Sequence, residues 1–187
     1  PPKRTKVEQL NIRFTNIPVR VAIRDIRTNH IGLMISIEGI VRKVNDVRPR
    51  LVKGLFRCPA GHPHYIEQGY GSIDIPDRCP TEGCTQRKLE LVPKASFFLD
   101  NQKARLQEAP EGLAGGAQPQ TIDVDILDDT AGILNAGDRV IINGIIRTHH
   151  RTISGQKSTI FDIYLECNSI ELPEQEYSEI EISYEDE

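Results

Sequence analysis

Three cysteines and one histidine fall into two short clusters, each of which also contains proline and glycine. The first cluster has the spacing C-x3-H and the second the spacing C-x4-C. Thiolate and imidazole groups are ligands that Zn²⁺ prefers, and two turns that supply two ligands each can close a tetrahedron around it. The pattern predicts a structural zinc site formed by Cys58, His62, Cys79 and Cys84. Because four protein ligands leave no position open for a substrate, a catalytic zinc is disfavoured.

The fourth ligand leaves one alternative open, because His64 lies only two residues beyond His62. His62 directly follows Gly61 at the turn and is preferred. Cys167 is far from both clusters and falls on the apolar face of a predicted strand, so we interpret it as a core residue. Four cysteines can also form two disulfides in a secreted protein, but two clusters with a histidine fit a metal in a reducing compartment better.

Outside the clusters, the chain consists mainly of short segments in which apolar and polar residues alternate. The predicted strands are residues 33–39, 51–57, 88–92, 96–99, 122–126, 139–146 and 161–167. Such strands with glycine-rich turns and little helix predict a mainly β fold, a five-stranded Greek-key barrel of the OB type. One or two helical turns are expected within residues 21–27. Gly39, inside a strand, is expected to mark a bulge or a sharp bend.

The two clusters divide the predicted barrel into two stretches of sequence. We expect residues 32–57 and 93–172 to form the barrel and residues 58–92 to form a zinc ribbon inserted between two of its strands. Residues 1–31 are expected to be an extended segment with a short helix. Residues 173–187 have the acidic composition of a linker or tail.

The charges are unevenly distributed along the chain. Residues 171–187 hold eight acidic residues and no basic one, out of totals of 27 Asp/Glu and 23 Lys/Arg, so the remainder is net basic. A basic surface favours a polyanion such as nucleic acid, and a solvated surface without a partner is the alternative. No apolar run approaches the roughly 18 residues that cross a bilayer, so we expect an intracellular chain without a membrane partner.

Residues 147–160 are rich in cations and hydroxyls and carry Ser-Gly near their middle, which predicts a projecting β-hairpin. Arg147 and Arg151 share one face of this hairpin, and Lys157 lies on the returning strand. Such groups bind phosphates without reading sequence, whereas an ordinary solvated hairpin is the alternative interpretation. Further candidate DNA-binding residues on the predicted barrel strands are Arg48, Arg50, Lys103 and Arg105.

Aromatic residues and nucleotide-binding motifs limit the predicted function further. The chain has no Trp, five Phe and five Tyr, so we expect an electrostatic, sequence-tolerant grip on DNA rather than base readout. The motif G-x-x-x-x-G-K-[ST] is absent, because Gln156 stands where glycine must precede Lys157. This chain is therefore not expected to be an ATPase or another enzyme.

Several motifs in the same order resemble the N-terminal region of archaeal minichromosome maintenance (MCM) replicative helicases. The resemblance covers nearly all of residues 10–172. The motifs are Ile12–Pro18, Ile37–Arg42, Val47–Arg50, Phe56–Cys58, Gln102–Glu108 and Gly137–Val140.

The resemblance implies an OB-fold with an inserted zinc ribbon that assembles into a homo-hexameric ring around single- or double-stranded DNA. It also implies that the zinc ribbons let two rings meet head to head, and that the hairpin reaches into the channel. The loop at residues 107–120 would communicate with an AAA+ ATPase domain, which alone would bind ATP and make the full-length protein an ATP-dependent DNA helicase.

Two departures from the family indicate a fragment. Residues 1–31 would lead from a missing helical subdomain, and residues 173–187 would lead toward the missing ATPase domain. The implied location is the cytoplasm of an archaeon, in association with the nucleoid. The main rival interpretation is a monomeric zinc-containing single-stranded-DNA-binding OB protein. A zinc hydrolase and an adaptor that uses the acidic tail are further rivals.

Overall fold

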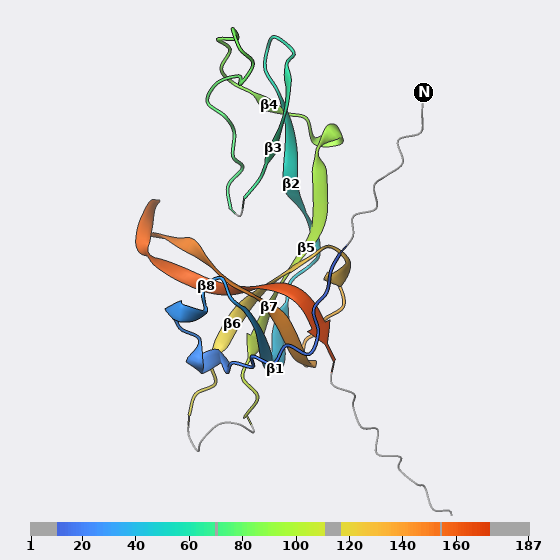
Figure 1. The fold of residues 1–187 in the computed structure, drawn as a ribbon, viewed down its shortest axis with the longest axis vertical. Helices are drawn as coiled ribbons and strands as arrows, with labels where there is room; N and C mark the ends of the chain where they lie inside the picture. The colour runs from blue at the N-terminus through green and yellow to red at the C-terminus, as the bar shows by residue number, and fades with distance from the viewer. Residues whose placement is uncertain (1–10, 70, 111–116, 154, 173–187) are drawn as a thin grey trace, which may run out of the picture.

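The computed structural model describes residues 11–69, 71–110, 117–153 and 155–172, and β-strands dominate them (Figure 1). The strands are β1 (Met34–Val44), β2 (Arg48–Arg57), β3 (Pro63–Glu67), β4 (Glu90–Leu91), β5 (Phe97–Gln107), β6 (Thr121–Leu127), β7 (Arg139–Ile153) and β8 (Gln156–Glu171). The helical elements of the described ranges are single 3-10 turns, among them η1 (Ile23–Asp25) and η2 (Thr28–His30). The predicted mainly β fold is confirmed.

Five strands close into a barrel. β1 pairs with both β5 and β7, β7 pairs with β8, and β6 pairs with β5. A parallel pairing of β6 with β8 completes the circle. Around the barrel the strands follow the order β1, β5, β6, β8, β7. Numbered by their position in the chain, these are the first, second, third, fifth and fourth barrel strands, and the third and fifth pair in parallel. This is the Greek-key order of an OB-fold.

The barrel interior is filled by the apolar residues of the alternating strands. Its fully buried side chains include Ile35, Ile37, Leu106, Ile126, Ile142, Ile146 and Leu165. Along β6, Ile122, Val124 and Ile126 point inward as their spacing predicts. Burying each such side chain stabilises the fold by about 1.5–3 kcal/mol relative to exposure.

Gly39 lies where β1 approaches β5 most closely. A Cβ atom at this position would lie 2.5 Å from the carbonyl oxygen of Gln107, so only glycine fits. The register shift in β1 lies between Val41 and Lys43. Of the two alternatives predicted at Gly39, a bulge or a sharp bend, the bulge is misplaced, and the glycine is required by the close packing of β1 on β5.

β2, β3 and β4 form an arm that extends away from the barrel (Figure 1). β2 contains residues 51–57, which we predicted as a barrel strand, but it pairs with β3, β4 and the first half of β5. β5 therefore belongs to both regions: residues 97–101 pair with β2 in the arm, and residues 101–107 pair with β6 in the barrel.

β7 and β8 continue beyond the barrel as a long antiparallel hairpin, drawn in orange in Figure 1. Their pairing extends to Thr152 opposite Lys157 and Ile153 opposite Gln156. The projecting hairpin predicted for residues 147–160 is thus confirmed. Within the described ranges, no helix is long and apolar enough to cross a membrane.

Candidate metal centre and nucleic-acid interface

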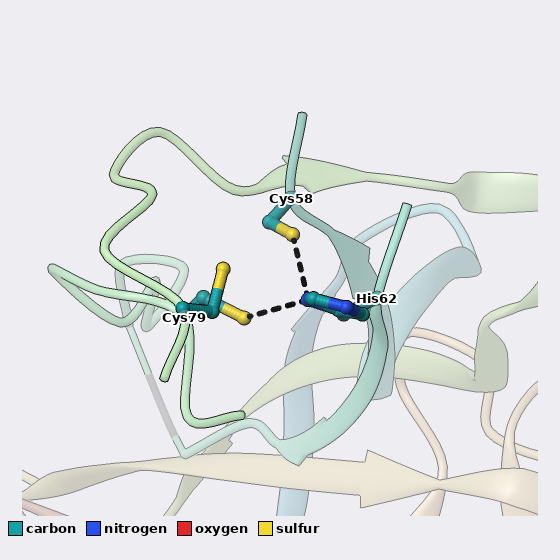
Figure 2. Close-up of side chains that lie close together, drawn as sticks. Cys58, His62 and Cys79 are labelled. Atoms are coloured by element: carbon teal, nitrogen blue, oxygen red, sulfur yellow. Dashed lines mark hydrogen bonds between the residues drawn. The ribbon is translucent and has the colours of Figure 1, made fainter. Parts of the chain in front are cut away.

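The four predicted zinc ligands come together at the tip of the arm. Cys58, His62, Cys79 and Cys84 each offer one ligand atom, and these atoms all lie within 4.8 Å of one another. Figure 2 shows the side chains of Cys58, His62 and Cys79 turned toward a common centre. The Nδ1 atom of His62 lies 3.6 Å from Sγ of Cys58 and 3.7 Å from Sγ of Cys79.

These distances fit a shared tetrahedral metal. Ordinary Zn–S and Zn–N bond lengths at a tetrahedral angle place sulfur and nitrogen about 3.6 Å apart. A group of three cysteines and one histidine that can hold a metal ion is therefore present, and both its chemistry and its spacing are consistent with zinc.

Two glycine turns position the ligands. Gly61 has a φ of 89°, and its amide donates to the carbonyl oxygen of Cys58 at 2.8 Å. Gly83 has a φ of 76° in the second turn, where the Cys84 amide donates to the Thr81 carbonyl at 3.0 Å. Left-handed backbone of this kind favours glycine. The first turn brings Cys58 close to His62, and the second turn brings Cys79 and Cys84 into the same group.

His64 lies beside the group rather than within it. Its Nε2 atom is 3.2 Å from Sγ of Cys79 and 3.2 Å from the hydroxyl of Thr81. Burial of Cys79 opposes its thiolate, but hydrogen bonds from Thr81, His62 and His64 outweigh burial and lower the pKa of Cys79 to about 5. A lowered pKa favours the thiolate form that a metal requires.

Cys167 lies in the barrel core, as its place on a strand predicts. Burial raises the pKa of its thiol to about 12, although Arg13 acts in the opposite direction. A thiol of this kind stays protonated, so Cys167 behaves as a small apolar residue.

Four of the predicted DNA-binding residues lie on one face of the sheet that joins arm and barrel. Residues directly opposite each other on paired strands share a face. On β5, Lys103 and Arg105 have the same parity as Leu99 and Asn101, which lie opposite Arg50 and Arg48 of β2. Lys43 of β1 lies opposite Arg105, and Lys53 of β2 lies opposite Phe97. We call this set the basic stripe: Lys43, Arg48, Arg50, Lys53, Lys103 and Arg105.

The first cation of the β7–β8 hairpin, Arg147, lies on the same outer face as the basic stripe. Arg147 on β7 lies opposite Tyr164 of β8, which is in register with Asp123 of β6, and Asp123 lies opposite Arg105. Arg147 and Arg105 therefore lie in one row across four strands. Arg151 is exposed further along the hairpin. Lys157 is placed by its backbone pairing with Thr152, and its side chain lies outside the described part of the chain.

Sequence reasoning missed three carboxylates on the same face. Asp123 accepts two hydrogen bonds from Arg105, at 2.7 and 3.1 Å. Glu166 accepts one from Arg147 at 2.9 Å. Asp125 lies 3.5 Å from the Arg50 guanidinium, and its burial raises its pKa. The alternation of apolar and acidic residues in β6 could have predicted the position of Asp123 and Asp125, because it puts them on the face of the strand that points away from the core.

A partly buried ion pair, with Glu108 buried and Arg24 half-buried, closes the base of the loop at residues 107–120. Glu108 accepts hydrogen bonds from the backbone amide and guanidinium of Arg24 and from the Gln120 amide at 3.0 Å. Its own amide donates to the Gln120 carbonyl at 3.0 Å. The Arg24 hydrogen bond lowers the pKa of Glu108 to about 2, against the opposing effect of burial. Glu108 thus fixes both ends of the loop against η1. Residues 111–116 of the loop lie outside the described ranges.

Comparison with known proteins gives consistent matches. A family model described as the MCM OB domain matches residues 22–150. The chain is 30% identical over 190 residues to the minichromosome maintenance protein MCM of Saccharolobus solfataricus. It is 36% identical over 138 residues to the DNA replication licensing factor mcm6 of Schizosaccharomyces pombe. These alignments cover 97% and 72% of this chain, but only 27% and 15% of the respective relatives.

A solved structure agrees with the sequence comparisons. It is the 1.8 Å crystal structure of the N-terminal domain of an archaeal MCM, and it matches with a TM-score of 0.69 at 35% identity. The match covers 81% of this chain and 61% of that one.

Proposed function

Because this chain belongs to the minichromosome maintenance (MCM) family, we propose that it is the DNA-binding, hexamer-forming N-terminal collar of an MCM replicative helicase. The observation that carries this proposal is the basic stripe, in which cations from three strands line one continuous sheet face. We place ATP hydrolysis and unwinding in a domain outside this chain, which spans 27% of the length of the Saccharolobus MCM protein.

The basic stripe binds the phosphates of single- and double-stranded DNA. Arg48, Lys103 and Arg105 are exposed, and two adjoining hollows in the surface share Lys103 and Asn45 in their lining. Guanidinium and ammonium groups contact phosphates irrespective of base, so binding tolerates any sequence. Each phosphate neutralised releases counterions, so affinity falls steeply as salt rises.

The hairpin adds a second grip. Arg147 and Arg151 extend the cationic surface beyond the barrel, and we place them, together with Lys157, in the central channel of the ring. Glu108 and Arg24 hold the loop at residues 107–120, which couples this collar to the ATPase domain. The partly buried pair fixes the base of the loop through several hydrogen bonds, which supports a role in transmitting a displacement.

Zinc at the arm tip has a structural role. Cys58, His62, Cys79 and Cys84 hold it, and it cross-links the two turns, leaving no position for a substrate. The arms let two homo-hexamers meet head to head. We place the protein in the cytoplasm of an archaeon, on the nucleoid.

The decisive experiment measures DNA affinity and oligomeric state together. Fluorescence anisotropy with single-stranded and duplex oligonucleotides, over a series of salt concentrations, is expected to give a steep salt dependence for both. The double variants Arg48→Ala/Lys103→Ala and Arg151→Ala/Lys157→Ala should each weaken binding broadly across sequences. The variant Arg139→Ala, whose arginine pairs with Glu38 outside the stripe, is the matched control.

Light scattering with and without DNA tests the ring. A hexamer supports the collar, whereas a monomer at every concentration would favour the rival single-stranded-DNA-binding protein. Unchanged DNA affinity in both double variants would remove the basic stripe and the hairpin from the function.

A further inference from the structure

Two aromatic side chains lie exposed on the arm, next to a lysine of the basic stripe. Tyr65 of β3 and Phe97 of β5 are 52% and 57% exposed. Their ring centroids are 5.9 Å apart, with the ring planes inclined by 48°. Lys53 Nζ lies 6.0 Å from the centroid of the Tyr65 ring. We call Tyr65 and Phe97 the aromatic platform.

The strand register puts the platform on the same face as the basic stripe. Phe97 has the parity of Lys103 and Arg105 on β5, whose residues 101–107 pair with β6 without a register shift. The extra residue at the register shift opposite Phe97 and Phe98 lies on β2, between Leu51 and Lys53, so the alternation along β5 itself is kept. Phe97 lies opposite Lys53, and Lys53 lies opposite Glu67, whose parity on β3 is that of Tyr65. The face therefore passes from cations on the barrel to aromatic rings on the arm. At about 3.4 Å per residue, Phe97 and Lys103 are about 20 Å apart.

A row of cations next to exposed aromatic rings is typical of protein surfaces that bind single-stranded nucleic acid. Bases that are not paired can stack on an aromatic ring, and the neighbouring cations hold the phosphates on either side. Bases inside a duplex are already stacked and cannot do so. Glu67 is the carboxylate within reach of Lys53, at 3.9 Å, and it leaves the rings themselves exposed.

We infer that single-stranded DNA bound along the basic stripe continues onto the arm and stacks a base on Tyr65 and Phe97. This rests on the proposed DNA-binding function and adds to it a preference for single strands, which cations alone do not provide. Because the chain lacks tryptophan and has few other aromatic residues, its sequence predicted an electrostatic grip rather than base readout. The platform adds base stacking from the arm.

The test compares affinities of the 187-residue chain for an oligothymidine of about 20 nucleotides and for a duplex of equal length. The variant Tyr65→Leu/Phe97→Leu is expected to bind the single strand about tenfold more weakly, with duplex affinity and the salt dependence unchanged, because no charge is altered. Tyr65→Phe keeps a ring and should retain the affinity. Phe14→Leu removes another exposed aromatic ring, 51% exposed, and should have no effect.

A spectroscopic measurement distinguishes stacking from a merely structural role. Since the chain has tyrosine but no tryptophan, its intrinsic fluorescence comes from tyrosine. Oligothymidine should quench this fluorescence, and Tyr65→Phe should remove part of the quenching while leaving the affinity unchanged. Zinc content and circular dichroism must match those of the original chain in every variant compared.

Three outcomes would overturn the inference. The first is unchanged single-strand affinity in the double variant, and the second is an equal loss for single strand and duplex. The third is an altered oligomeric state with unchanged DNA affinity, which would make the platform a contact between subunits. If Arg48→Ala/Lys103→Ala loses DNA binding while the platform variant Tyr65→Leu/Phe97→Leu keeps it, the proposed DNA-binding function is supported and the stacking inference is overturned. A chain that binds no DNA at low salt would overturn both.

Discussion

The barrel and the arm are both built mainly from antiparallel strand pairs, with one parallel pairing, β6 with β8, in the barrel, but different interactions hold the two regions together. Among the residues that the structure describes, sixteen buried ones, mostly Ile, Val and Leu, form the barrel core. The buried cluster of the arm contains Phe56, Leu89 and two of the candidate metal ligands, Cys58 and Cys79. A few apolar side chains cannot offset the conformational entropy of so many ordered residues. Apolar burial thus stabilises the barrel, whereas we expect the arm to depend on a metal ion held by its Cys/His group.

Removal of the metal should separate the two regions most strongly. Chelation, or the variant Cys84→Ser, is expected to unfold residues 58–92 and leave the barrel folded, because structural zinc contributes about 10–16 kcal/mol to small zinc domains. Hydrogen exchange measures this directly: β3 should lose protection while β1 and β7 keep it. An ordered, protected arm after complete removal of the metal would contradict the structural role of the site.

A cavity in the barrel core should have the opposite effect. Ile142→Ala removes a fully buried side chain and is expected to lower the free energy of unfolding by about 2–5 kcal/mol. Urea denaturation followed by tyrosine fluorescence gives this value. The exposed Ile75 on the arm is the control, and Ile75→Ala should change stability by less than about 0.5 kcal/mol.

Acid should reveal the charge that the barrel buries. The pKa of Glu108 is lowered to about 2, so its contribution is present above the ordinary value of 4.5 and is lost as the pH falls toward 2. Glu108→Gln is expected to destabilise the chain by about 1–3 kcal/mol at neutral pH, and this difference should shrink as the pH falls below 4.5. Denaturation of both proteins across this range provides the measurement.

The arm offers a matched carboxylate for that experiment. Glu67 is exposed, with its side chain 87% accessible, and lies 3.9 Å from Lys53. Glu67→Gln should change stability by less than about 0.5 kcal/mol at every pH. A constant difference between Glu108→Gln and the original chain down to pH 2 would show that packing, rather than charge, explains its effect.

The smallest effect, on DNA affinity, is expected at Arg105, a residue of the basic stripe whose charge is already neutralised by Asp123. Asp123→Asn frees Arg105 from its carboxylate partner and should tighten DNA binding about two- to fivefold, since an exposed pair of this kind is worth about 0.2–1 kcal/mol. Glu38→Gln, which releases Arg139 outside the stripe, is the control. Weaker binding by Asp123→Asn would mean that the aspartate orients Arg105 for DNA rather than competing with it.

Local patterns in the sequence predicted the parts of the molecule that depend on near neighbours. The alternation of Ile122, Val124 and Ile126 predicted a half-buried strand, and the spacing of the cysteines predicted the metal group. The turn at residues 154–155 predicted the hairpin. In each case, the residues of one strand, one turn or one ligand cluster lie within a few positions of one another, and only the meeting of the two ligand clusters joins segments 17 positions apart.

Features that depend on pairing between distant segments were not predictable in this way. The sequence of residues 51–57 is typical of a half-buried strand in either region. Their place in the arm follows only from the pairing of β2 with β3 and β4. Glu108 and Arg24 are 84 positions apart, and nothing in their local sequence marks them as partners. Tyr65 and Phe97 share a face only because of the register of β2 with β3 and β5.

The unbroken course of β5 has a mechanical consequence. A module attached by a flexible linker can swivel without disturbing its neighbour, but the arm shares a strand with the barrel. Any rotation of the arm must bend β5 near Asn101 or shear its ladder with β6. Torque applied at the tip of the arm would therefore reach the barrel wall as strain in one strand, with Asn101 as the point about which β5 bends.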